Sequence, residues 1–338
     1  MKERDFRIDL LRAFACIMVL FCHAPQHYTG QPGSFLVAID TYYTMAWGPI
    51  LFFAISGVCL LGGDREAIPF LKKRFSRILF PTIFWSIVYI ILQCYVWKTI
   101  PQSQFWYMIP SMLVKPQYGL MWFMYALISL YLMVPILSRW LNSCKRQEVL
   151  FYLAIWSITL IIPYFDVLGT QTESLVVKNG MLFYMSGFLW CAVAGFYCQK
   201  WVRRSFTNKW HLFYTVVILL SPAYILLLQQ LGEVNFDTSL TFFSMATTLF
   251  AIIFVYSVNI TRIAASPTLN TLVSHISKYS FGIYLFHMVI LFPFKQWIGD
   301  YNLNYAIQIP ITVLVVAPLS YLASWGISKL PFGKYIIG

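Results

Sequence analysis

The chain has 338 residues, of which 59% are hydrophobic and only 11% are charged. Soluble domains carry roughly a quarter charged residues, so this composition excludes an ordinary soluble protein and predicts an integral membrane protein. The net charge of +12 does not indicate nucleic-acid binding, because the Lys and Arg residues stand in short clusters between apolar runs. The seven cysteines are scattered without a CxxC pair, which argues against a disulfide framework.

Ten apolar runs are long enough to cross the hydrocarbon core, and they predict an all-α bundle of about ten transmembrane helices. Prolines interrupt several runs, which leaves the count open by one pair. No run remains for a soluble domain, so residues 1–338 are expected to form a single membrane domain, with residues 98–119 as an interfacial or re-entrant piece. The runs cover residues 8–27, 46–63, 75–97, 120–140, 149–165, 180–198, 211–230, 239–259, 279–298 and 305–328.

The distribution of positive charge sets the expected orientation. With a cytoplasmic N-terminus, all but four of the 24 Lys and Arg residues fall in segments that face the cytoplasm. Cytoplasmic loops of membrane proteins carry such an excess, so both termini are expected to be cytoplasmic. The four exceptions are Lys98, Lys115, Lys178 and Lys295.

The first apolar run carries two side chains that a bilayer disfavours, Arg12 and His23. Eleven helical steps of about 100° bring them to nearly the same face, with roughly 16 Å of rise between them. Ionisable groups at membrane depth are costly and survive mainly where they face a cavity or a partner. Asp9 lies one turn before Arg12 and either pairs with it structurally or orients Arg12 or a bound cation.

Two alternatives to a catalytic role for His23 follow from the sequence, a structural hydrogen bond and a metal site. A single histidine in a membrane helix is often hydrogen-bonded to a neighbouring helix and nothing more. His27 follows at i+4, which is a spacing that metal sites use. However, Pro25 disturbs the helix between them, and no carboxylate or cysteine stands at ligand spacing, so no metal site is expected.

Arg74 and Arg77 stand one helical turn apart at the start of the third run. They are either ordinary topology charges or an anion site, because paired arginines suit bidentate phosphate contacts. With Arg12 at similar depth, they predict a cytoplasmic pocket for a polyanion. The pair Ser56-Gly57 is more typical of close helix packing, and for His287 in the ninth run a structural hydrogen bond is the default expectation.

Taken together, these segments resemble the membrane-bound acyltransferase family 3, the bacterial O-acyltransferases with an integral domain of ten helices. The likeness follows the order of the chain from the first helix to the ninth. It rests on Arg12-x10-His23, Phe52-Phe53-x-x-Ser56-Gly57, Arg74-x-x-Arg77, Trp122-Phe123-Met124-Tyr125, Leu130-Tyr131, Val134-Pro135 and residues 280–287.

The resemblance implies an acyl-CoA-dependent O-acyltransferase of the bacterial cytoplasmic (inner) membrane. It would move an acyl group, expected to be acetyl from acetyl-CoA, to a hydroxyl of a surface glycan such as lipopolysaccharide, or of a lipid-linked precursor. His23, as general base or transient acyl acceptor, and Arg12 would be catalytic, and Arg12, Arg74 and Arg77 would hold acyl-CoA. The further candidates are Asp9, Ser56, Trp122, Tyr284 and His287. Membrane lipid is a further expected partner. Neither a metal nor a nucleic acid is expected to bind.

The chain departs from the family pattern at two places. Many members carry an Asp just before the Phe-Phe run, where this chain has Pro49-Ile50-Leu51, and a His before Trp122, where it has Gly119-Leu120-Met121. The first departure leaves no obvious carboxylate to orient His23.

Two other functions remain open from the sequence. The main rival is a transporter or lipid-linked glycan flippase, although the chain lacks an acidic relay and evident inverted halves. A haem or metal electron carrier would require His23 and His287 on facing helices at matched depth.

Overall fold

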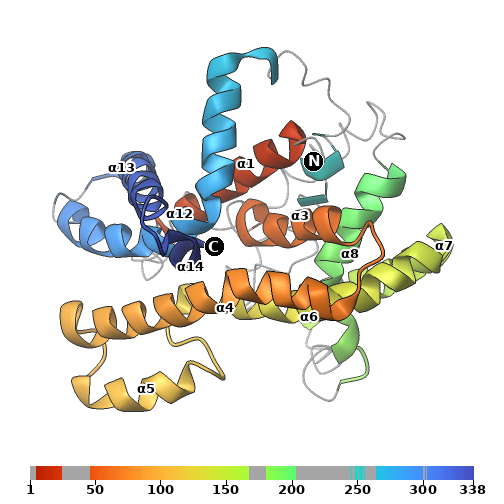
Figure 1. The fold of residues 1–338 in the computed structure, drawn as a ribbon, viewed down its shortest axis with the longest axis horizontal. Coiled ribbons are helices and arrows are strands. Elements are labelled where there is room, and N and C mark those ends of the chain that lie inside the picture. The colour runs from red at the N-terminus through yellow and green to blue at the C-terminus, as the bar shows by residue number, and fades with distance from the viewer. Residues whose placement is uncertain are drawn as a thin grey trace.

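The computed structural model describes residues 5–24, 46–166, 180–202, 245, 248–249, 251–253, 255, 264–299, 301 and 303–338. These residues form helices, turns and loops, and no β-strand occurs among them (Figure 1). The main helices are α1 (Phe6–His23), α3 (Leu51–Leu60), α4 (Ala67–Ile91), α5 (Phe105–Ser111), α6 (Trp122–Ser143), α7 (Arg146–Asp166), α8 (Leu189–Tyr197), α12 (Pro267–Gly299), α13 (Tyr305–Ile327) and α14 (Gly333–Ile337). Short π-helical and 3-10 segments adjoin them at Ala46–Ile50, Leu92–Val96, Gln102–Gln104, Gly119–Met121, Phe183–Met185 and Cys198–Val202.

Four helical stretches in the described part of the chain are long and apolar enough to cross a membrane. They are Ala67–Val96, Gly119–Ser143, Pro267–Gly299 and Tyr305–Ile327, and a shorter apolar helix covers Trp47–Leu60. The expected all-α membrane class is confirmed. The count of ten spans and the cytoplasmic termini stay predictions, and the runs at 211–230 and most of 239–259 lie outside the described residues.

Three helix boundaries differ from those expected from the sequence. The third span begins already at Ala67, so Arg74 and Arg77 lie within α4. The ninth span begins at Pro267 rather than near residue 279, because proline fits the first position of a helix. Residues 180–188 form turns and the short 3-10 segment Phe183–Met185 rather than the start of an α-helix, and Gly187 takes a positive φ of 94° just before α8 begins.

Helix α1 packs against α3, α12 and α13, and the C-terminal helix α14 packs on α4 near the middle of the molecule (Figure 1). Helices α3 and α8 approach each other most closely at two glycines. A Cβ atom on Gly57 would lie 1.8 Å from the carbonyl oxygen of Ala192, and one on Gly195 would lie 2.3 Å from that of Ala54. The close packing predicted for the Ser56-Gly57 pair is therefore confirmed.

Residues 98–119 contain one 3-10 turn and the seven-residue helix α5, which is too short to cross a bilayer. Trp106 and Tyr107 on α5 are largely exposed. The Tyr125 hydroxyl on α6 donates a hydrogen bond to the carbonyl of Met112, just after α5. The segment therefore does not span the membrane as a helix, and its expected interfacial or re-entrant position stays a prediction.

Candidate functional site

Three helices bring four cations to one pocket of about 260 Å³. Arg12 comes from α1, Arg74 and Arg77 come from α4, and Lys278 comes from α12. We call it the basic pocket. Among its described lining residues there is no Asp or Glu, although the C-terminal Gly338 also reaches it. The structure thus brings Arg12, Arg74 and Arg77 to one pocket, while its cytoplasmic position and its binding of a polyanion stay predictions. Lys278 lines the same pocket but was not expected there, because in the sequence it is indistinguishable from an ordinary topology charge.

Aromatic and sulfur atoms position two of these arginines. The Arg74 guanidinium lies 5.7 Å from the ring centre of Phe70 and 5.9 Å from that of Tyr131, which are distances for cation–π contacts. The Arg12 guanidinium contacts the Cys59 sulfur at 3.6 Å. Arg77 is exposed to solvent. These contacts hold the cations without neutralising them, so they remain suited to an anionic ligand.

Arg65, in the loop before α4, adds a fifth cation beside this group. Its guanidinium donates to the Leu60 carbonyl at 2.6 Å, at the C-terminal end of α3, where cations are favoured. Burial lowers the pKa of Arg65, and the charge of Arg74 lowers it further. The mutual repulsion indicates a crowded set of positive charges that an anion would stabilise.

A second, much smaller cavity of about 20 Å³ lies at His23, and we call it the His23 chamber. Trp122 lines it, while Ser56 lines the basic pocket and donates a hydrogen bond to the Phe52 carbonyl at 2.8 Å. Three residues line both cavities and form an aromatic partition between them. They are Phe52, Phe123 and Tyr284.

The partition is built from contacting rings. The ring centres of Phe123 and Tyr284 lie 5.4 Å apart, and those of Phe52 and Phe123 lie 6.0 Å apart. The Tyr284 hydroxyl donates a hydrogen bond to the carbonyl of Leu120, which ties α12 to the 3-10 segment just before α6. The basic pocket, which Arg12 lines, and the His23 chamber therefore share a wall of aromatic side chains.

His287 on α12 lies beside His23 on α1, with ring centres 5.2 Å apart and ring planes tilted by 37°. His287 is fully buried, and its Nδ1 lies 2.6 Å from the Tyr284 carbonyl oxygen. The structural hydrogen bond predicted for His287 is confirmed. Its contact with His23 was missed, because a single sequence does not reveal which faces of two distant helices meet. Among the described residues, no group of three His, Cys, Asp or Glu side chains could hold a metal ion, and His27 lies outside them.

Asp9 is buried and has a partner that the sequence analysis did not name. Its carboxylate accepts a hydrogen bond of 2.6 Å from the Ser277 hydroxyl on α12. Asp9 therefore links the cytoplasmic end expected for α1 to the helix that carries His287.

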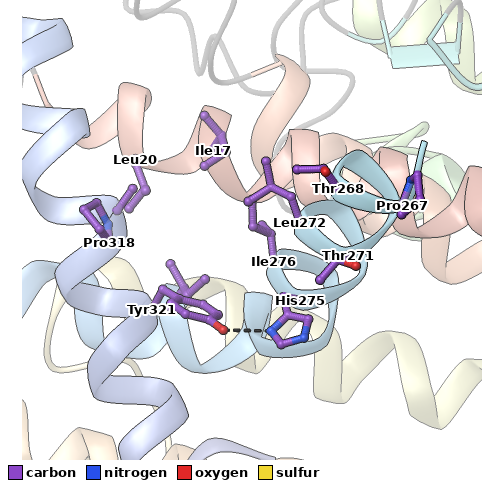
Figure 2. Close-up of a pocket in the computed structure, with 12 residues that line it drawn as sticks. Ile17, Leu20, Pro267, Thr268, Thr271, Leu272, His275, Ile276, Pro318 and Tyr321 are labelled. Atoms are coloured by element: carbon purple, nitrogen blue, oxygen red, sulfur yellow. Dashed lines mark hydrogen bonds between the residues drawn. The ribbon is translucent and has the colours of Figure 1, made fainter. Parts of the chain in front are cut away.

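The largest of the cavities described, about 690 Å³, lies elsewhere, among α1, α12 and α13 (Figure 2). Its lining is mostly apolar, with Thr268, Thr271 and a 2.8 Å hydrogen bond between His275 and Tyr321 as polar features. Of its described lining residues, none is a predicted site residue, since α1 presents Ile17 and Leu20 to it rather than Arg12 or His23. The candidate site is therefore the pair of smaller cavities.

A family model described as an acyltransferase domain matches residues 5–329, nearly the whole chain. The chain belongs to acyltransferase family 3. No curated protein and no solved structure matches it. Family membership makes the chain a membrane acyltransferase, and it does not favour the transporter or flippase alternative.

Proposed function

We propose that this acyltransferase moves an acyl group, specifically acetyl, from cytoplasmic acyl-CoA to a hydroxyl of a surface glycan or its lipid-linked precursor. The observation that supports this most is the aromatic partition. A cation-lined pocket and a histidine chamber share Phe52, Phe123 and Tyr284 as their common wall. A polyanionic donor can thus bind on one side of the wall while its acyl end reacts on the other.

In this proposal the phosphates of acyl-CoA bind Arg12, Arg74, Arg77 and Lys278 in the basic pocket. Arginine suits this role because its planar guanidinium makes two parallel hydrogen bonds to a phosphate. We assign Arg12 to donor binding and to alignment of the thioester, because it lines the basic pocket and not the His23 chamber.

The size of the His23 chamber supports acetyl over longer acyl groups. A space of about 20 Å³ is little more than the one probe sphere needed for a water molecule. An acetyl group is the smallest common acyl group and needs the least displacement of Phe52 and Phe123. A longer chain would have to push these rings apart.

The proposed reaction is a direct transfer with His23 as general base. One His23 nitrogen takes the proton of the acceptor hydroxyl while the oxygen attacks the thioester carbonyl carbon. A C–O bond forms, the C–S bond breaks, and the proton passes to the leaving sulfur, so that CoA departs as the thiol. Such proton transfer typically contributes 10²–10⁴-fold. A covalent acyl-His23 intermediate is the variant of the same scheme.

The proposed setting is the bacterial inner membrane, with both termini in the cytoplasm and the acceptor at the outer surface. In this orientation Arg12 lies at the donor side and His23 towards the acceptor side. The roughly 16 Å of helical rise between them then covers part of the distance that the acyl group has to travel.

The test uses the purified protein in lipid nanodiscs with radiolabelled acetyl-CoA and a total glycolipid extract as acceptor. We expect release of free CoA thiol and transfer of label to the glycan fraction, in proportion to the protein added. In cells, mass spectrometry of surface glycans should show an acetyl increment that disappears when the gene is deleted. A transporter or flippase would cleave no thioester, and that result would overturn the proposal.

A further inference from the structure

A histidine that acts as general base usually has its second ring nitrogen held by an acceptor. That acceptor fixes the tautomer and the orientation of the ring, and it stabilises the imidazolium that forms. A carboxylate commonly fills this role. Among the described residues that line the His23 chamber, none is Asp or Glu, and residues 49–51 read Pro49-Ile50-Leu51.

The hydrogen bond that His287 makes through one ring nitrogen leaves its other ring nitrogen as an acceptor next to His23. A carbonyl oxygen can only accept, so the 2.6 Å contact with Tyr284 requires the hydrogen on Nδ1 of His287. In the neutral ring, Nε2 then carries the lone pair. This Nε2 atom is buried and has no hydrogen-bond partner in the described part of the chain. Buried polar atoms without partners are rare, and catalytic roles are one reason they persist.

The neighbouring ring is that of His23. A hydrogen bond of about 3 Å between two imidazole edges brings the ring centres to roughly 5 Å. The observed separation is 5.2 Å, with a tilt of 37° between the rings. The separation of the two rings is therefore that of a hydrogen-bonded imidazole pair, and the proposed bond requires the half-buried His23 ring to turn an N–H towards Nε2 of His287.

We propose that His287 is the positioning residue for His23, with Nε2 accepting the N–H that a carboxylate usually accepts. This inference rests on the proposed function, because it assigns a role through His23 as base. His287 keeps its own proton on Nδ1 throughout. The His23 nitrogen that points away from His287 takes the hydroxyl proton, and the resulting positive charge on His23 is stabilised by the Nε2 lone pair.

Two substitutions separate this role from a purely structural one. His287→Asn keeps an amide donor near the Nδ1 position, so the bond to the Tyr284 carbonyl is retained and the acceptor is lost. His287→Gln places its amide oxygen near the Nε2 position, so the acceptor is retained. Both variants are compared with wild type for kcat, KM for acetyl-CoA and thermal unfolding in detergent.

We expect His287→Asn to lose about 10²-fold or more in kcat, as general-base histidines do when their orienting partner is removed. Its KM for acetyl-CoA and its unfolding temperature should stay near wild type. His287→Gln should keep a kcat within about tenfold of wild type. Wild-type kcat in His287→Asn, or equal losses in both variants, would overturn the inference. Should His287→Asn fail to fold, the kcat of His287→Gln decides alone.

A double substitution checks that His287 acts through His23. In a His23→Ala background, adding His287→Asn should leave the residual rate unchanged, because residues that act as a unit are not additive. A further loss as large as that in wild type would show a separate, structural effect and reject the proposal. If wild-type protein itself transfers no acetyl group, the proposed function fails first. If it transfers and only the His287 results disagree, the inference alone fails.

Discussion

The carboxylate of Asp9 accepts a 2.6 Å hydrogen bond from the Ser277 hydroxyl, and both side chains are buried. This contact joins α1 to α12 beside the basic pocket, which Ser277 itself lines. The same two helices carry His23 and His287 further along. The contact therefore links the two helices that carry the histidine pair.

Removing the hydroxyl should test this role. Ser277→Ala deprives the buried carboxylate of a donor, and hydrogen bonds to charged groups contribute about 1.5–3 kcal/mol. We expect a lower unfolding temperature in detergent. Ser143→Ala is the matched control, since Ser143 is exposed and bonds only to carbonyls of its own helix. Equal unfolding temperatures for the two variants would show that the contact stabilises nothing.

The cations of the basic pocket should control donor affinity. Arg77→Ala removes an exposed guanidinium and should weaken acetyl-CoA binding roughly tenfold to a hundredfold, as expected for a charge-assisted contact. Arg74→Lys keeps the charge but loses the planar fork, so it should weaken binding as well. Isothermal titration calorimetry with CoA measures both.

Lys72→Ala is the control for this series, because Lys72 lies on the same helix but outside the basic pocket. Its affinity for CoA should stay within twofold of wild type. If Arg77→Ala, Arg74→Lys and Lys72→Ala all bind CoA equally well, Arg74 and Arg77 are ordinary topology charges and not part of a CoA site.

The sequence predicted the helical membrane class, and it grouped Arg12, Arg74 and Arg77, which the structure brings to one pocket. These predictions depend on hydropathy and helical spacing, which act within one segment at a time. The pairing of His23 with His287 and of Asp9 with Ser277 depends on which faces of α1 and α12 meet. Tertiary packing determines which faces of the two helices meet, so these pairings cannot be predicted from a single sequence.

The N-terminal ends of the helices were also predicted incompletely from the sequence. Charged residues such as Lys72 and Arg74 read as loop in a hydropathy profile, yet they form regular turns of α4. A helix can extend beyond the hydrocarbon core, and hydropathy reports only the part inside it.

Replacing the proposed base should separate chemistry from binding. We expect His23→Ala to lose 10²–10⁴-fold in acetyl transfer, the usual range for a general base, while CoA affinity stays unchanged. The control is His275→Ala, because His275 lies in the large apolar cavity and bonds to Tyr321 there. It should keep near-wild-type transfer. Near-wild-type acetylation by His23→Ala would exclude the proposed mechanism.

The aromatic partition should determine the length of the acyl group. Phe123→Ala opens the wall between the basic pocket and the His23 chamber, so butyryl-CoA should gain relative to acetyl-CoA by about tenfold or more in kcat/KM. One or two methylenes in a tight pocket are worth about this much. The ratio of the kcat/KM values for the two donors within one variant does not depend on the amount of folded protein.

Phe151→Ala, at an exposed site on α7, should leave this ratio unchanged. An unchanged ratio in Phe123→Ala would mean that the partition does not select the donor.

The contact between α3 and α8 should tolerate no side chain at Gly57. A Cβ there would lie 1.8 Å from the backbone oxygen of Ala192, and backbone cannot move aside as a flexible side chain can. Gly57→Ala should therefore force the two helices apart and destabilise the protein by about 1–3 kcal/mol or more, the range seen for overpacked cores. Because α3 also carries Phe52 and Ser56, the variant should lose donor affinity together with stability.

Gly63→Ala is the control, since nothing lies within 4 Å of a Cβ at that position. Thermal unfolding and CoA titration of both variants measure the effect, and a Gly57→Ala protein as stable as Gly63→Ala would show that the two backbones do not pack this closely.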